Sequence, residues 1–164
     1  MEHKTPNELI EEIKSQNCEE GLKAAFALAV LHDEDAAGPL IQTVGVGGDE
    51  NWVVRSQACV ALLIIGEKAI PDITKALTED ENYRVRAGMA EVLGMMRSSE
   101  GVGDLLNALE DEHYKVRKYA VLAFRRIEQV DETVTEKVRK LRSQETNQEV
   151  LEAIDAFNTK LGIS

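Results

Sequence analysis

A seven-residue segment that returns twice along the chain constrains the fold more than any other feature. Residues 49–55 read Asp-Glu-Asn-Trp-Val-Val-Arg, and the same pattern begins again about 31 residues later and once more after a further 31. The columns that share one register are Asp49, Asp80 and Asp111; Glu50, Glu81 and Glu112; Trp52, Tyr83 and Tyr114; Val54, Val85 and Val116; and Arg55, Arg86 and Arg117. A period of this length indicates that the chain stacks copies of one supersecondary unit.

The apolar residues after each arginine have the spacing of one face of an α-helix. The three copies of this stripe are Ala58, Ala61, Leu62 and Ile65; Met89, Val92, Leu93 and Met96; and Ala120, Ala123, Phe124 and Ile127. A shorter stripe follows each one, as Ile70, Ile73 and Leu77; Val102, Leu105 and Leu109; and Val134, Lys137 and Leu141. Each unit is therefore predicted to be two helices. Because neither helix can bury its apolar face alone, the units must stack into a solenoid.

The repeated pattern also resembles a known family. Read as Asp-x-x-x-x-Val-Arg-x-x-Ala-x-x-x-Leu from Asp49 to Leu62, it is similar to the short HEAT-like repeat of the phycobilisome-lyase type, and the match is strong over residues 49–141. The resemblance implies an all-α, right-handed α-α superhelix whose second helices line the concave side. It also implies that the arginine side chain reaches along the stack to turn aspartates of its own or a neighbouring repeat.

The period divides the chain into repeats and two flanking segments. We expect one domain over residues 1–164, with four to five two-helix repeats near residues 18–48, 49–79, 80–110 and 111–143 and an unpaired capping helix in each flank, residues 5–17 and 144–164. Thr5, Pro6 and Glu8 predict the start of the first cap, as an N-cap, a first-turn proline and a capping-box glutamate. The last segment places five apolar residues on one face: Val150, Ala153, Ile154, Phe157 and Leu161.

The sequence contains no recognisable catalytic or cofactor site. No two of its three histidines share a helical face at i and i+4, and the His-Glu dipeptide that binds iron in HEAT-like hydroxylases does not occur in that order. The glycine-rich segment at residues 45–48 lacks the lysine of a phosphate-binding loop. Cys18 and Cys59 form no Cys-x-x-Cys pair and are interpreted as reduced. We therefore predict a non-enzymatic protein with no metal and no cofactor.

Charge and hydropathy limit the environment and the partners. The formal net charge is −11, which opposes binding to a nucleic-acid backbone. The N-terminus lacks a basic segment followed by an apolar run, and no apolar stretch reaches the roughly 18 residues of a membrane span. We expect a cytoplasmic protein that binds neither nucleic acid nor membrane.

Two groups of residues are candidates for binding another protein. Lys75, Asn107 and Arg139 occupy one register position on the second helices, and Lys140 and Arg142 add positive charge in the one basic repeat, where nine Lys and Arg residues face six Asp and Glu. The aromatic column of Trp52, Tyr83 and Tyr114 has two interpretations. It either covers the joints between repeats or forms an exposed strip that anchors a peptide.

Three functional classes remain open at this point. The first is a scaffold or adaptor that binds a partner protein of asymmetric charge through its concave helices. The second, implied only by the family resemblance, is a bilin lyase or lyase-associated factor that acts on a tetrapyrrole-carrying protein. The third is a nucleic-acid-acting HEAT-like enzyme, which the acidic charge opposes.

Overall fold

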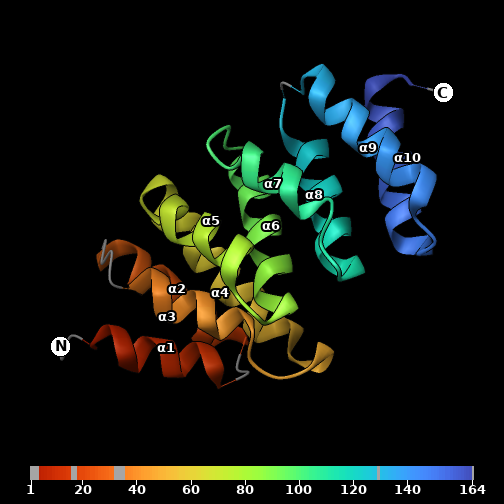
Figure 1. Cartoon of the computed structure of the whole chain (residues 1–164). Coiled ribbons are helices and arrows are strands. Elements are labelled where there is room, and N and C mark those ends of the chain that lie inside the picture. The colour runs from red at the N-terminus through yellow and green to blue at the C-terminus, as the bar shows by residue number, and fades with distance from the viewer. Residues whose placement is uncertain (1–3, 16–17, 32–35, 129, 164) are drawn as a thin grey trace. The chain divides into compact units, whose positions relative to one another are not determined.

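The computed structural model describes residues 4–15, 18–31, 36–128 and 130–163 (Figure 1). Within that part of the chain every regular element is a helix and none is a strand. The elements are α1 (Pro6–Lys14), α2 (Cys18–Leu31), α3 (Ala37–Val44), η2 (Asp49–Asn51), α4 (Trp52–Ile65), η3 (Gly66–Ala69), α5 (Ile70–Glu79), α6 (Tyr83–Met96), α7 (Val102–Ala108), α8 (Tyr114–Arg126), α9 (Glu132–Gln144) and α10 (Gln148–Leu161). The predicted all-α class is confirmed.

The chain divides into two compact units, residues 1–73 and 74–164, and α5 begins in the first and ends in the second. In the first unit, α2 packs against α1 and α4, and α3 packs against α4 (Figure 1). Its largest fully buried side chains are Ile13, Leu28, Leu40, Leu62 and Ile73. The helix α1 thus covers one side of the first two-helix repeat. The single domain over residues 1–164 stays a prediction.

In the second unit, α8 is the central helix. It packs against α6, α7 and α10, and α10 also contacts α9 (Figure 1). Its largest fully buried side chains are Met89, Leu93, Leu105, Leu109, Phe124, Ile154 and Phe157. As predicted, α10 has no second helix of its own among the described residues and covers the last repeat with Val150, Ala153, Ile154 and Phe157, whereas Leu161, the fifth residue predicted on this face, is half-buried. Burial of one apolar face per helix drives this packing.

The helix starts follow the sequence signals. Thr5 is the N-cap of α1, with Pro6 in the first turn, and the Glu8 carboxylate accepts a hydrogen bond from the Thr5 backbone nitrogen at 2.7 Å. This reciprocal arrangement is the predicted capping box, which satisfies backbone N–H groups that the first turn leaves without intrahelical partners.

Of the stripe predicted for α9, Val134, Lys137 and Leu141, only Val134 is buried, and Leu141 is half-buried. The helix buries Val134 and Val138, whereas the Lys137 side chain is 34% exposed and its ammonium lies 2.9 Å from a Glu110 carboxylate oxygen. A buried ammonium loses its hydration, so Lys137 keeps its charge at the surface and Val138 takes the inward position.

Two glycines predict opposite responses to the same substitution. A Cβ added at Gly94 in α6 would lie 2.5 Å from the Ala123 Cα of α8, whereas one added at Gly103 in α7 meets nothing within 4 Å. We expect Gly94→Ala to lower the free energy of unfolding by about 1–3 kcal/mol, because the two backbones would have to separate. Gly103→Ala should raise it by about 0.4–1 kcal/mol, because alanine restricts the unfolded chain. Chemical denaturation of both variants measures the difference in sign.

A stabilising Gly94→Ala would show that α6 and α8 do not approach as closely as described.

No described helix is both long and apolar enough to cross a membrane.

Candidate protein-interaction surface

The arginine column joins each repeat to the next in the second unit. Arg86 is 8% exposed, and its Nε and Nη2 donate to the two carboxylate oxygens of Asp111 at 2.8 and 3.0 Å. Its Nη1 donates to the backbone carbonyls of Asp80 and Glu81 at 2.9 and 3.1 Å. One side chain therefore holds the turn of its own repeat and the acid of the following one. The hydrogen bonds to Asp111 raise the pKa of Arg86 above its ordinary value.

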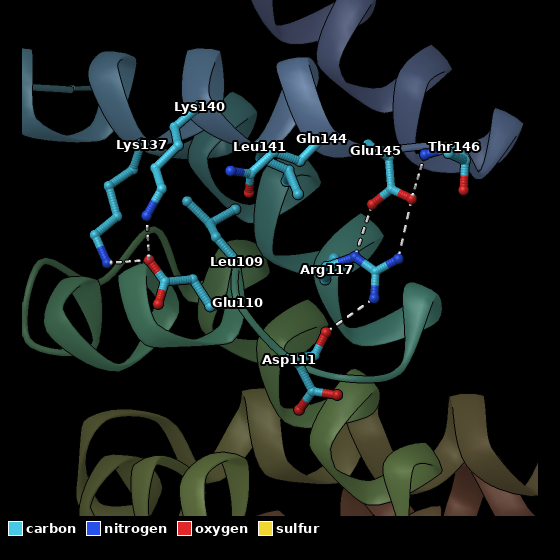
Figure 2. Close-up of a pocket in the computed structure, with 10 residues that line it drawn as sticks. All are labelled: Leu109, Glu110, Asp111, Arg117, Lys137, Lys140, Leu141, Gln144, Glu145 and Thr146. Carbon is cyan, nitrogen blue, oxygen red and sulfur yellow. Dashed lines mark hydrogen bonds and ion pairs between the residues drawn. The ribbon is translucent and has the colours of Figure 1, made fainter.

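Arg117 makes the same kind of contacts one repeat later, with a different acidic residue. Its Nε and Nη2 donate to Glu145 at 2.7 and 3.0 Å (Figure 2). Its Nη1 donates to the carbonyls of Asp111 and Glu112 at 2.9 and 3.0 Å. The bidentate pair is the strongest geometry available to an arginine and a carboxylate. The prediction of an aspartate partner is confirmed at Arg86 and wrong at Arg117, because a glutamate, Glu145, stands three residues before α10 where Asp111 stands three residues before α8.

Each acid also organises the turn that carries it. Asp111 Oδ1 accepts from the backbone nitrogen of His113 at 2.8 Å, and Glu145 Oε1 accepts from Thr146 and Asn147 at 3.0 and 2.9 Å. The Glu145 side chain is only 3% exposed, and the guanidinium of Arg117, helped by these backbone donors, holds the pKa of its carboxyl below the ordinary value.

The first member of the column is less completely described. The Arg55 side chain is half-buried, and the side chain of Asp49 lies outside the described part of the structure. Pairing at Arg55 therefore stays a prediction.

The residue two positions after each turn acid caps the following helix. Asn82 accepts from the Arg84 nitrogen, His113 Nδ1 accepts from the Lys115 nitrogen at 3.2 Å, and Asn147 accepts from Glu149 and Val150. This capping role was not predicted from the sequence, although asparagine is a preferred N-cap residue and Asn51, Asn82 and His113 share one register. The side chain of Asn51 makes no capping hydrogen bond to α4.

The aromatic column does not behave as one strip. Trp52 is 61% exposed at the start of α4, which agrees with the exposed interpretation. Tyr83 is half-buried because its ring stacks on His113 of the next repeat, with centroids 3.5 Å apart and planes at 9°. Tyr114 is also half-buried, and its ring stacks on that of the preceding residue, His113, with the two centroids 5.0 Å apart. Tyr83 thus helps to cover a joint between repeats, whereas Trp52 remains accessible.

His113 predicts a pH dependence of stability. Desolvation, and then the charge of Lys115, lower its pKa, and its Nδ1 must stay unprotonated to cap α8. The unfolded chain, with a histidine pKa of about 6.5, therefore binds a proton that the folded chain resists. Stability from this group is complete above pH ~6.5 and falls as the pH is lowered toward the folded pKa.

His113→Asn removes the titrating group but keeps a capping side chain of the kind used at Asn82 and Asn147. We expect the free energy of unfolding of the variant to fall less between pH 7.5 and pH ~5.5 than that of the native protein. Equal pH slopes, measured by urea denaturation, would contradict a role for His113 titration.

The candidate residues on the second helices are all exposed. Lys75 lies on α5, Asn107 on α7 and Arg139 on α9, and each is solvent-accessible. The neighbours Ile73, Leu77, Leu105 and Leu109 are buried, which agrees with the predicted alternation of reading and core positions.

The basic residues of α9 point in two directions. Lys140 lies 3.8 Å from the Glu110 carboxylate that also pairs with Lys137, and these side chains border a hollow of about 420 Å³ (Figure 2). Leu109 and Leu141 lie between the ion pairs in this hollow, which Arg117 and Glu145 close at its other end (Figure 2).

Arg139 and Arg142 instead border a second hollow of about 450 Å³, between α9 and α10. There Arg142 pairs with Asp155 of α10. The predicted cluster of Arg139, Lys140 and Arg142 is therefore divided between two sides of one helix, since residues three apart lie on one face and adjacent residues diverge.

The described residues hold no group of three or more His, Cys, Asp or Glu side chains arranged to bind a metal ion. Cys59 is buried in α4 at 4% exposure, and the Cys18 side chain lies outside the described residues. Hydrogen bonds and ion pairs dominate the chemistry of this surface.

Comparison with known proteins agrees with this geometry. The sequence profile of the family described as HEAT repeats matches residues 70–158, which is more than half of the 164 residues. The chain belongs to the HEAT repeat family. The predicted family resemblance is thereby confirmed. The match begins at the start of α5 and ends within α10.

Two solved structures share the fold of this HEAT repeat protein. One is a chain from the complex of CpcE and CpcF of phycocyanin lyase from Nostoc sp. PCC7120, with 18% identity, a TM-score of 0.67 and coverage of 93% of this chain and 97% of that one. The other is an engineered protein, with 20% identity, a TM-score of 0.51 and coverage of 95% and 78%. At these identities the likeness shows the fold alone. None of the curated proteins matches the sequence significantly.

Proposed function

We propose that this HEAT repeat protein is a non-enzymatic scaffold that binds another protein through the second helices of its repeats, acting as one domain over residues 1–164. One observation carries the proposal. Lys75 and Asn107 are exposed between residues that are buried, and Arg139 is exposed at the same register position. Core residues preserve the stack while the exposed position changes from lysine to asparagine to arginine, as a surface that reads a partner requires.

Electrostatics supports a partner of uneven charge. The basic repeat places Lys137, Lys140, Arg139 and Arg142 on α9, in a chain whose net charge is −11. Opposite potentials at a partner surface increase the association rate, and salt reduces this gain because exposed charges are screened over ~8 Å at physiological ionic strength. Trp52, as an exposed aromatic residue, adds a second candidate contact in the first unit.

Charge reversal on α9 tests the proposal. After a partner is isolated by affinity capture from the native host, Arg139→Glu combined with Lys140→Glu should slow association by about tenfold and flatten its salt dependence. Lys23→Glu combined with Lys68→Glu is the matched control, because it changes the net charge equally on α2 and η3, where both lysines are exposed. Stopped-flow fluorescence measures both association rates.

An unchanged association rate in the α9 double variant, with circular dichroism showing an intact fold, would exclude α9 as the docking surface. A loss equal to that of the control would indicate a general charge effect and would also count against the proposal.

A lyase-related role is the second candidate. It is supported by the similarity in fold to a chain of the phycocyanin lyase complex, over nearly the full length of both proteins. If the protein served in bilin attachment, mixing it with a free bilin and a bilin-accepting apoprotein should produce covalent chromophore, visible by zinc fluorescence after denaturing electrophoresis. No faster attachment than in its absence would reject this candidate.

A further inference from the structure

A second group of basic residues, separate from those on α9, lines a hollow in the second unit. The hollow lies at the C-terminal ends of α6, α8 and α10. Its volume is about 560 Å³, and four of the six described residues that line it are cationic: Arg97, Arg125, Arg126 and Lys160. Among these described residues Glu128 is the single acidic one and Leu122 the apolar one. The hollow thus has a local excess of positive charge in a chain whose net charge is −11.

Arg97 occupies a backbone conformation that favours glycine. It follows the last residue of α6 with φ 53° and ψ 30°, in the left-handed region, and it is the one described residue other than glycine with a positive φ. Gly66 stands at the same register position after α4 and also has a positive φ, 76°, but with ψ −145° its conformation differs from that of Arg97. An arginine here carries a steric cost that glycine avoids, and such strain is found where a side chain serves binding.

One carboxylate of the chain itself, that of Glu128, already binds in the hollow. Arg97 Nη1 lies 3.2 Å from the Glu128 carboxylate, and the two side chains are 65% and 80% exposed. A pair this exposed opens at little cost, so an outside carboxylate can replace Glu128.

Each of the four cations lies at the C-terminal end of a helix, where the helix dipole favours positive charge. Lys160 donates to the carbonyl of Ile127 at 2.6 Å and so satisfies the end of α8. Arg125 and Arg126 are exposed in the last turn of α8, and neither forms an ion pair with any residue that the structure describes. Two guanidinium groups therefore remain available to a ligand.

We propose that this hollow binds an acidic peptide segment of a partner protein through its Asp or Glu side chains. Guanidinium groups match carboxylates in bidentate geometry, and Arg97, Arg125 and Arg126 provide three of them around one opening. A volume of about 560 Å³ exceeds a single small anion and suits several residues of peptide. The overall charge of −11 repels the continuous phosphate backbone of a nucleic acid and a phospholipid surface, whereas a short acidic segment meets only the local positive field.

A labelled hexaglutamate peptide tests the site on the full chain by fluorescence anisotropy, with hexaglutamine as the neutral control. We expect hexaglutamate alone to bind, and Arg125→Glu combined with Arg126→Glu to weaken it by about tenfold or more. Arg139→Glu combined with Lys140→Glu has the same change in net charge and should alter the dissociation constant by less than about twofold. Glu128→Gln, which removes the competing carboxylate, should tighten binding.

Arg97→Gly gives an independent test, because it should raise the melting temperature or leave it unchanged while weakening hexaglutamate binding. Equal losses in both double variants, an unchanged affinity in the Arg125 and Arg126 variant, or binding to anionic phospholipid vesicles without binding to hexaglutamate would each overturn the proposal. Since the Arg139 and Lys140 variant tests the α9 surface separately, failure of either site is distinguishable from failure of the other.

Discussion

Replacing Arg117 by alanine is expected to lower the free energy of unfolding by about 3–5 kcal/mol. The substitution leaves the Glu145 carboxylate, whose side chain is 3% exposed, without its cation, and it removes the donor to the carbonyls of Asp111 and Glu112. A buried charge that loses its partner keeps the cost of desolvation without the compensating attraction. Arg86→Ala should have a similar effect through Asp111.

Lys137→Ala is the matched control, because it breaks an ion pair between repeats whose members are 34% and 57% exposed. Exposed pairs contribute about 0–1 kcal/mol, so this variant should be nearly as stable as the native protein. Urea denaturation at neutral pH compares the three variants. Equal stability of Arg117→Ala and Lys137→Ala would show that the arginine column does not hold the repeats together.

The pair between Arg117 and Glu145 also contributes to acid sensitivity. The folded chain lowers the pKa of Glu145, so the stabilisation is complete above the unfolded value of about 4.5 and is lost as the pH falls toward the folded pKa. Arg117→Ala removes the main cause of this shift. The acid limb of its stability curve should therefore be shallower than that of the native protein.

Leu93→Ala and Leu62→Ala are each expected to lower the free energy of unfolding by about 2–5 kcal/mol. Both leucines are fully buried, Leu93 in α6 of the second unit and Leu62 in α4 of the first. Truncation removes buried methyl groups and leaves a cavity, because helices held by neighbours on several sides close only partly around it. The range reflects how far each site can collapse.

Leu22→Ala provides the control, since Leu22 is 42% exposed on α2 and its truncation should change stability by at most about 0.5 kcal/mol. Chemical denaturation followed by circular dichroism at 222 nm measures all three. If the two buried leucines cost no more than Leu22, the apolar stripes would not form the core of the repeats.

Most of the fold was predictable because its signals lie within single helices. The stripe through Ala58 and Leu62 is buried as expected, and Thr5 begins α1 with the predicted capping box. Such patterns depend on the 3.6-residue period and on local hydrogen bonds. The α9 stripe departed from its copies because Lys137 replaces an apolar residue there, and Val138 filled the inward position.

The candidate surface was predictable only in part. Lys75, Asn107 and Arg139 are exposed as their shared register predicts, and at Lys75 and Asn107 this follows from the burial of the neighbouring apolar residues. The sequence did not predict that Lys140 and Arg142 lie on different sides of α9, because their partners, Glu110 and Asp155, come from segments far apart in the chain. The basic hollow was also missed, because its cations come from the ends of three helices far apart in the chain.

The period, the two-helix repeat, most of the buried faces and the arginine column can be read from the sequence. These follow from residue spacing, which is a property of one chain segment at a time. Tertiary structure alone decided the partners: that Arg86 takes Asp111 while Arg117 takes Glu145, that Tyr83 stacks on His113 while Trp52 stays exposed, and that Arg97 meets Glu128. The neighbour of each side chain depends on how one repeat stacks on the next, which the residue spacing within a single helix does not specify.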